Sequence, residues 1–281
     1  MPVTIQEKLS WVPFRIRICY EEHELGIGTA FIYRHKGESY IITNWHNVSG
    51  RRPYDKKLIS KYAVAPDNLS TEVPMASPEK LEIEIPTSSK EDLGNGESLV
   101  GWKSYTMELY KNEVPIWYVH PEHKHLVDVV AIPMDSDGTK LIVANDESLE
   151  LTNFTLRPSI DAFVLGYPLG LTGGAKFPIW KRASIASEPD IDLDKLPKFL
   201  IDTATREGMS GSPVYAQING YFTPEDKPGI ENAIIGEGSR FAGIYSGRLG
   251  DDIFKAQMGV VWKEKAIIAI IEGKVVDESS I

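Results

Sequence analysis

The sequence predicts an all-β fold, and three observations support this prediction. Many short segments are rich in β-branched or aromatic residues and are bounded by Gly, Pro, Asn or Asp, which is the pattern of strands joined by turns. Apolar and charged residues alternate in "FRIRI" (14–18) and "LEIEI" (81–85), as expected for strands with one buried and one exposed face. No long amphipathic helix separates these segments, which disfavours a parallel βαβ architecture. A sandwich and a barrel both remain open at this point.

The expected strands follow one another along the whole chain. They are residues 14–20, 26–35, 38–46, 81–86, 115–121, 126–134, 161–168, 199–204, 212–218, 240–248 and 257–262. Residues 51–98 are the loosest stretch, in which Pro, Ser, Lys and Glu recur, and we interpret it as an insertion, extending to about residue 115, with room for two strands in 51–98. A polar segment at 145–158 separates two strand-rich halves. The predicted units are therefore residues 1–148 and 149–281.

One helix is expected at the end of the chain, over residues 262–272. In this segment Ile267, Ile268 and Ile271 share one helical face, Glu and Lys lie opposite, and Gly273 follows as a stop signal. An apolar face of this kind could bind a partner protein, but it more often packs on the protein's own sheets. We therefore expect the helix to cover part of the β structure.

The composition is that of an ordinary globular protein. The chain has 281 residues, 42% of them hydrophobic, and a net charge of -10. This acidic balance argues against a nucleic-acid-binding protein or one that binds anionic membranes. The single cysteine, Cys19, cannot form an intramolecular disulfide, and the first residues contain no continuous apolar stretch typical of a secretory signal. We therefore expect a cytoplasmic protein without a membrane anchor.

Three polar residues stand in contexts that favour catalysis. His46 follows a β-branched strand at the entry to a loop, and Asp128 lies inside the apolar run "HLVDVVAIP". A buried, unpaired charge is costly, so this aspartate should have a dedicated partner. Ser210 lies in "GMSGSPV" (208–214) between two glycines. A serine needs a base, an orienting group for the base and donors for an oxyanion before it can act as a nucleophile.

The glycines around Ser210 fit the last of these requirements. Gly208 and Gly211 can adopt backbone conformations closed to other residues. The backbone N–H groups of Gly208 and Ser210 could then converge on one point, as an oxyanion hole requires. The alternative interpretation is an ordinary tight turn between two strands.

These residues belong to short motifs that follow one another in a definite order. The chain resembles the trypsin-like (chymotrypsin-fold) serine peptidases, in particular bacterial members without disulfides. The order of base, acid and nucleophile is the one found in chymotrypsin barrels, whereas subtilisin and the α/β-hydrolases use other orders. The matching motifs span residues 26–262 and are "GIGTAFIY", "ITNWHNV", "VDVVAIP", "FVLGYPLG", "REGMSGSPV" and "FAGIYSGR".

The resemblance implies two six-stranded antiparallel β-barrels packed face to face, with a C-terminal α-helix. His46 and Asp128 would come from the first barrel and Ser210 from the second. It implies a serine endopeptidase in which His46 is general base and then acid, Asp128 orients it, and Ser210 forms an acyl-enzyme. The substrate would be a protein or peptide, and no cofactor or metal is implied.

The resemblance also implies where a substrate would lie. Ala204 would form the base of the primary pocket, and Ser246, Gly247 and Arg248 would form a wall that pairs with the substrate backbone. Because position 204 carries no carboxylate, we expect no trypsin-like preference for Lys or Arg. Arg248 could bind an acidic side chain, plug the pocket or face solvent.

Two positions depart from the family pattern. Met209 replaces the aspartate that secreted members pair with a newly cut N-terminus, which suggests that such a cleavage does not activate this site. A regulatory partner or ligand that orders "TREGMS" (205–210) is one hypothesis for its control. Trp45 replaces the small residue usual before the base, and we assign it no role beyond filling space.

Other interpretations of the motifs are weaker. His120, His123 and His125 in "HPEHKH" lack a helical i, i+4 spacing and a nearby cysteine, so we favour a loop over a metal site. Residues 166–174, "GYPLGLTGG", lack the ending of a phosphate-binding loop. The main rival hypothesis is a protease fold whose triad is idle or conditionally active, serving as a binding or regulatory module.

Overall fold

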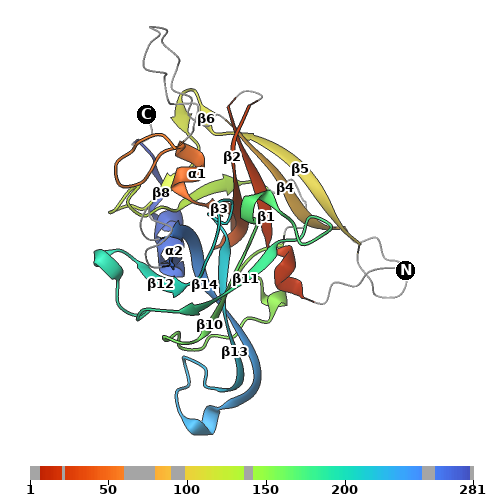
Figure 1. Ribbon diagram of the computed structural model, residues 1–281, viewed down its shortest axis with the longest axis vertical. Helices are drawn as coiled ribbons and strands as arrows, with labels where there is room; N and C mark the ends of the chain where they lie inside the picture. The colour runs from red at the N-terminus through yellow and green to blue at the C-terminus, as the bar shows by residue number, and fades with distance from the viewer. Residues whose placement is uncertain are drawn as a thin grey trace.

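The computed structural model describes residues 7–20, 23–59, 80–89, 99–135, 142–248 and 257–278. Within these ranges the protein consists of two antiparallel β units and a C-terminal helix (Figure 1). The predicted all-β fold class is therefore confirmed. The sheets come from consecutive parts of the chain, apart from one short strand that follows the helix and returns to the first sheet.

The first sheet comes almost entirely from the first half of the chain. Its hydrogen-bonded order is β16-β8-β9-β3-β2-β1-β4-β5, and six of these strands have five or more residues. Their bounds are β1 (Pro13–Tyr20), β2 (His23–His35), β3 (Glu38–Thr43), β4 (Lys80–Ser89), β5 (Leu99–Glu108), β8 (Tyr118–Val119), β9 (Val130–Met134) and β16 (Val275–Val276). A separate pair is formed by β6 (Tyr110–Lys111) and β7 (Val114–Pro115).

The second sheet closes into a six-stranded barrel with the order β10-β11-β12-β15-β14-β13. The strands are β10 (Asp161–Gly166), β11 (Ile179–Ile185), β12 (Lys198–Asp202), β13 (Pro213–Phe222), β14 (Ile234–Arg248) and β15 (Met258–Lys263). The register between β14 and β15 shifts between Tyr245 and Gly247, which leaves Ser246 in a bulge. A bulge changes the direction in which the side chain at that position points, here that of Ser246.

Helices are few in the described residues. The α-helices are α1 (Trp45–Ser49) and α2 (Glu264–Gly273), and the 3-10 turns are η1 (Lys8–Trp11), η3 (Glu147–Leu149), η4 (Pro168–Gly170), η5 (Leu193–Lys195) and η6 (Ile230–Asn232). The predicted C-terminal helix is confirmed, but its buried face holds Ile267, Ile270 and Ile271, whereas Ile268 is only half-buried. None of the helices in the described ranges is long and apolar enough to cross a membrane.

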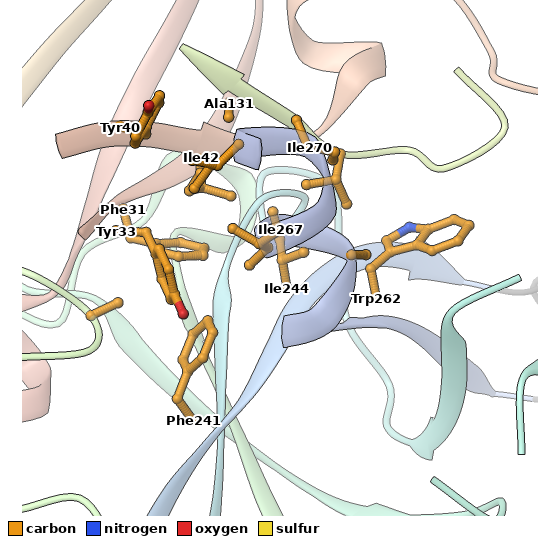
Figure 2. Packing of buried hydrophobic residues seen from close by; sticks show 14 of the residues in the cluster. Phe31, Tyr33, Tyr40, Ile42, Ala131, Phe241, Ile244, Trp262, Ile267 and Ile270 are labelled. Carbon is orange, nitrogen blue, oxygen red and sulfur yellow. The ribbon is translucent and has the colours of Figure 1, made fainter. Parts of the chain in front are cut away.

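In the part of the chain that the structure describes, the hydrophobic core has three parts. One cluster fills the first sheet's own interior, and one fills the closed barrel. The third lies between the two units, where side chains of β2, β3 and β9 meet those of β14 and β15 (Figure 2). The helix α2 contributes Ile267 and Ile270 to this cluster and packs against β8 and β9 on one side and β14 and β15 on the other. This shared core joins the two units.

Several strand boundaries differ from the prediction. Residues 38–46 form a strand only to Thr43, and residues 126–134 form one only from Val130. The expected strand 115–121 is broken into β7 and β8. The strand β11 was missed because only Ala183 and Ile185 of its seven residues are buried, which leaves little alternation to read. Of the two strands expected within residues 51–98, β4 lies in that range, whereas β5 begins only at Leu99; both extend the first sheet beyond β1. Residues 60–79 and 90–98 of that range lie outside the described residues.

Candidate active site

His46 lies on a short helix rather than in the loop that the sequence suggested. It is the second residue of α1, directly after the end of β3. The helix stops at Gly50, whose φ of 66° is left-handed and whose N–H donates to the His46 carbonyl at 3.0 Å. The His46 side chain is 18% exposed, so its imidazole is shielded but still reachable from solvent.

Asp128 lies two residues before β9 and is only 4% exposed. Both of its carboxylate oxygens are used by His46: Oδ1 accepts the backbone N–H at 2.9 Å, and Oδ2 lies 2.7 Å from the ring Nδ1. A carboxylate accepts from Nδ1 only if that nitrogen carries the proton. This pairing therefore selects the tautomer in which Nε2 is free to accept a proton.

Ser246 also binds this carboxylate. Its hydroxyl donates to Asp128 Oδ2 at 2.6 Å from the bulge in β14. Sequence reasoning had assigned Ser246 only to the substrate wall, and the contact with Asp128 was missed. Nothing in the local sequence links positions 246 and 128, because the bond crosses from the closed barrel to the first sheet.

The loop around Ser210 is held by its carbonyl groups. The oxygens of Glu207, Gly208 and Met209 accept from Leu169 N (2.6 Å), Thr29 Oγ1 (2.7 Å) and Ser212 N (3.1 Å), and that of Ser210 accepts from Thr29 N (2.8 Å). Gly208 and Gly211 have φ values of 89° and 90°, so the predicted left-handed conformations are confirmed. A Cβ at Gly211 would overlap the Thr29 carbonyl oxygen, so glycine is required there for space as well.

These anchors determine which N–H groups remain available. In a trans peptide, the C=O of one residue and the N–H of the next point in opposite directions. A carbonyl that is bound to a donor on one side therefore directs the next N–H to the opposite side. The N–H groups of Met209, Gly211 and Ser212 donate to Arg206, Tyr245 and Met209. Within the described residues, the N–H groups of Gly208 and Ser210 donate to no protein atom. They are the two donors that the sequence assigned to an oxyanion hole.

Ser210 lies next to α1, although its chain position is far from that helix. Its carbonyl accepts from Asn47 Nδ2 at 3.3 Å, and Asn47 follows His46 directly. Both residues are described, and no hydrogen bond joins Ser210 Oγ to the His46 imidazole in this part of the chain. A nucleophile–base hydrogen bond is commonly long in a ligand-free site and tightens when substrate is bound.

The residues assigned to the substrate wall, Ser246, Gly247 and Arg248, are the last three residues of β14. Gly247 is half-buried, while Ala204 and Arg248 are exposed. Beside Ala204, the Tyr245 hydroxyl is bonded to the Thr205 hydroxyl. Burial raises the pKa of Tyr245 to about 12.

The Tyr245 ring also occupies the space next to Gly259. A Cβ built at Gly259 would lie 2.6 Å from that ring. The volume between Thr205 and Gly259 is therefore filled by a tyrosine that sequence reasoning did not single out.

The other residues that the sequence analysis discussed take part in packing or in turn hydrogen bonds. Met209 is 1% exposed in the barrel core, where no carboxylate could be placed without burial cost. His120 Nδ1 accepts the backbone N–H groups of Glu122 and His123, which makes it a turn residue. No group of three potential metal ligands occurs in the described ranges. In the 166–174 loop, Leu169 donates its N–H to the Glu207 carbonyl in the loop around Ser210.

No family model matches the chain, and no curated protein matches it. Among solved structures, the Rv3671c protease of M. tuberculosis in its active form is 15% identical, with 96% of this chain and 83% of that chain covered and a TM-score of 0.43. The serine endoprotease from Yersinia pestis is 12% identical, with 97% and 66% covered and a TM-score of 0.47. The HtrA-type protease AlgW with tripeptide is 12% identical, with 97% and 64% covered and a TM-score of 0.49.

The chain thus spans slightly less than two thirds of the length of the last two chains. At these identities and TM-scores, the likeness assigns no role to any residue.

Proposed function

We propose that the protein is a serine endopeptidase that acts through His46, Asp128 and Ser210. One observation carries this proposal: a buried carboxylate uses both of its oxygens on His46, and Ser210 is tied by its carbonyl to the residue that follows His46. A buried structural histidine normally has both ring nitrogens satisfied, whereas among the described residues His46 is bonded only through Nδ1 and its Nε2 is left as an acceptor. An imidazole prepared in this way beside a serine is suited to take a proton from it.

The chemistry follows from these positions. His46 Nε2 accepts the Ser210 hydroxyl proton while Oγ forms a bond to the carbonyl carbon of a peptide. The imidazolium is stabilised by Asp128 and then gives its proton to the leaving amine, whose bond to carbon breaks. Water repeats the sequence on the acyl-enzyme, with His46 again acting first as base and then as acid.

The Ser210 loop supports charge stabilisation in the tetrahedral states. Among the residues that the structure describes, the N–H groups of Gly208 and Ser210 have no acceptor, and the carbonyls around them are bound by Thr29, Leu169 and Ser212. Such preorganised donors need no rearrangement when the oxyanion forms. Loss of one donor of this kind costs about 10²- to 10³-fold in rate in serine proteases.

Substrate preference is proposed on the same basis. Ala204 offers no carboxylate to a basic side chain, and the neighbouring space is occupied by the Tyr245 ring. We therefore expect no trypsin-like preference, with Ser246, Gly247 and Arg248 pairing with the substrate backbone. Strong cleavage after Arg in a fluorogenic peptide library would overturn this expectation. A cytoplasmic location remains a prediction from the sequence.

The test is labelling with a fluorophosphonate probe. Wild type should become modified at Ser210, as located by peptide mass spectrometry, whereas Ser210→Ala and His46→Ala should not, with all three proteins showing the same unfolding midpoint. Labelling that persists in His46→Ala would contradict the proposed relay.

One observation favours a second candidate, a conditionally active or idle module. In the described residues Ser210 Oγ makes no hydrogen bond to His46, so the base and nucleophile are not yet joined. In that case pure wild type would fail to label at any pH near neutrality. Activation by a partner or ligand would then be sought by repeating the labelling in a cell extract.

A further inference from the structure

The end of the chain meets the helix that carries His46. After α2, the short strand β16 pairs with β8, and Asp277 follows it directly. The Asp277 carboxylate oxygen Oδ2 accepts the indole N–H of Trp45 at 2.6 Å and that of Trp117 at 3.2 Å. The C-terminal part of the chain accordingly lies beside α1 in Figure 1.

Asp277 is held in an apolar setting. It is 1% exposed, and both tryptophans are fully buried in the core of the first sheet. A carboxylate removed from water is expensive unless donors compensate it, and bonds from N–H groups to a charged oxygen are stronger than neutral ones. The indole N–H groups of Trp45 and Trp117 supply such donors to the buried Asp277 carboxylate.

The helix α1 depends on hydrogen bonds to the rest of the protein for its stability and position. It has five residues, which is far too short for an isolated helix to be stable. Asn44, at its N-cap, makes no side-chain cap bond and instead donates to the Asp128 carbonyl at 2.7 Å. Its position is therefore set by side chains that reach outward, among them Trp45 to Asp277 and Asn47 to Thr43.

We propose that Asp277 is a positioning residue for the base: it holds Trp45, and through Trp45 it fixes the orientation of α1 and of the adjacent His46 imidazole. This inference rests on the proposed function. It gives Trp45 a role that the sequence did not reveal, and it makes the segment after α2 part of the active-site framework. A misplacement of about 1 Å at a reacting group can cost about 10²-fold in rate.

The chain offers a matched pair of variants. Trp45→Phe and Trp117→Phe each remove one indole donor to the same oxygen, but only Trp45 lies on α1. We expect the rate of fluorophosphonate labelling to fall about tenfold or more in Trp45→Phe and to stay within about threefold in Trp117→Phe. Each protein is measured well below its own unfolding midpoint, so that only folded molecules are compared.

Two further variants separate positioning from general stability. Asp277→Asn keeps an acceptor oxygen and the volume, so it should retain labelling within about threefold. Asp277→Leu should slow labelling about as much as Trp45→Phe, although it also removes the bond from Trp117, because only the Trp45 bond is expected to affect labelling. The double variant should lose little more, because both changes remove the same bond between Trp45 and Asp277. Equal labelling of folded Trp45→Phe and Trp117→Phe would overturn the proposal.

A second readout is independent of Ser210. The proton between His46 Nδ1 and Asp128 should give a low-field NMR signal, assigned by its loss in His46→Ala. We expect this signal to shift or broaden in Trp45→Phe and to be kept in Trp117→Phe. An unchanged signal in Trp45→Phe refutes the positioning role. If wild type is not labelled but the signal responds as expected, the positioning role stands and the proposed function falls.

Discussion

Replacing Asp128 by Asn tests the proposed relay most directly, because the geometry predicts which proton moves. Among the described residues, Asp128 accepts from three donors: the His46 backbone N–H, the His46 ring Nδ1–H and the Ser246 hydroxyl. Asparagine has one acceptor oxygen and one amide that can only donate. The backbone N–H cannot change its role, so the asparagine oxygen should remain at the Oδ1 position. The amide then faces Nδ1, which must lose its proton.

The size of the effect follows from this exchange. The imidazole proton moves to Nε2, the nitrogen that would accept the Ser210 proton, and the base is blocked. In a serine protease that uses a Ser-His-Asp triad, replacing the aspartate by asparagine lowers the rate by about 10⁴-fold, or about 5 kcal/mol. Turning the amide over would restore the tautomer but would set its NH₂ against the His46 N–H. That unpaired buried donor costs about 1–3 kcal/mol, so the loss should be at least about fivefold.

The assay is the second-order rate of fluorophosphonate labelling at Ser210, with the unfolding midpoint as a check on folding. Ser246→Ala is the matched control, since it removes one of the three donors and leaves both His46 contacts in place. We expect a loss of about tenfold or less in Ser246→Ala and a much larger one in Asp128→Asn. A folded Asp128→Asn protein that labels as fast as Ser246→Ala would refute the tautomer argument.

Three other predictions concern the scaffold. Gly37→Ala and Gly211→Ala both place alanine at a φ near 90°, but only at Gly211 would the new Cβ collide with backbone atoms. In urea unfolding, the free energy of unfolding should therefore fall by about 1–2 kcal/mol in Gly37→Ala and by clearly more in Gly211→Ala. Equal losses in the two variants would contradict this. Burial raises the pKa of Glu264 above 4.5, so the folded protein holds that proton more tightly, and stability should fall as pH rises through the raised value. Glu264→Gln should flatten this slope in unfolding midpoints measured from about pH 4.5 to pH 8, and an identical slope in both proteins would count against it. Thr29→Val should leave the Gly208 carbonyl without its donor, costing about 1–3 kcal/mol and slowing Ser210 labelling, whereas an unchanged labelling rate would show that this anchor does not matter.

Local sequence was sufficient for the elements whose signal is local. The alternating run at 14–18 predicted β1, and the spacing of isoleucines predicted α2, because a buried face imposes its period on neighbouring residues. The glycines at 208 and 211 predicted left-handed backbone because glycine has no Cβ and adopts positive φ without steric cost. These features depend on residues only a few positions apart.

The sequence alone did not predict the helix α1, which contains His46. The run at 38–46 reads as one strand, but Asn44 and Trp45 make their important contacts with Asp128 and Asp277, far away in the chain. Tertiary contacts of this kind override the local preference for an extended backbone.

By itself, the sequence determined the all-β class, the C-terminal helix and the residue types that a serine nucleophile would need. Only the tertiary structure decided that Asp128 gives both oxygens to His46, that Ser246 joins them, and that Asp277 binds Trp45. The physical reason is the range of the interactions. Backbone periodicity and glycine conformations are set by near neighbours, whereas hydrogen bonds between buried polar groups join whichever donors and acceptors the packed sheets bring within about 3 Å.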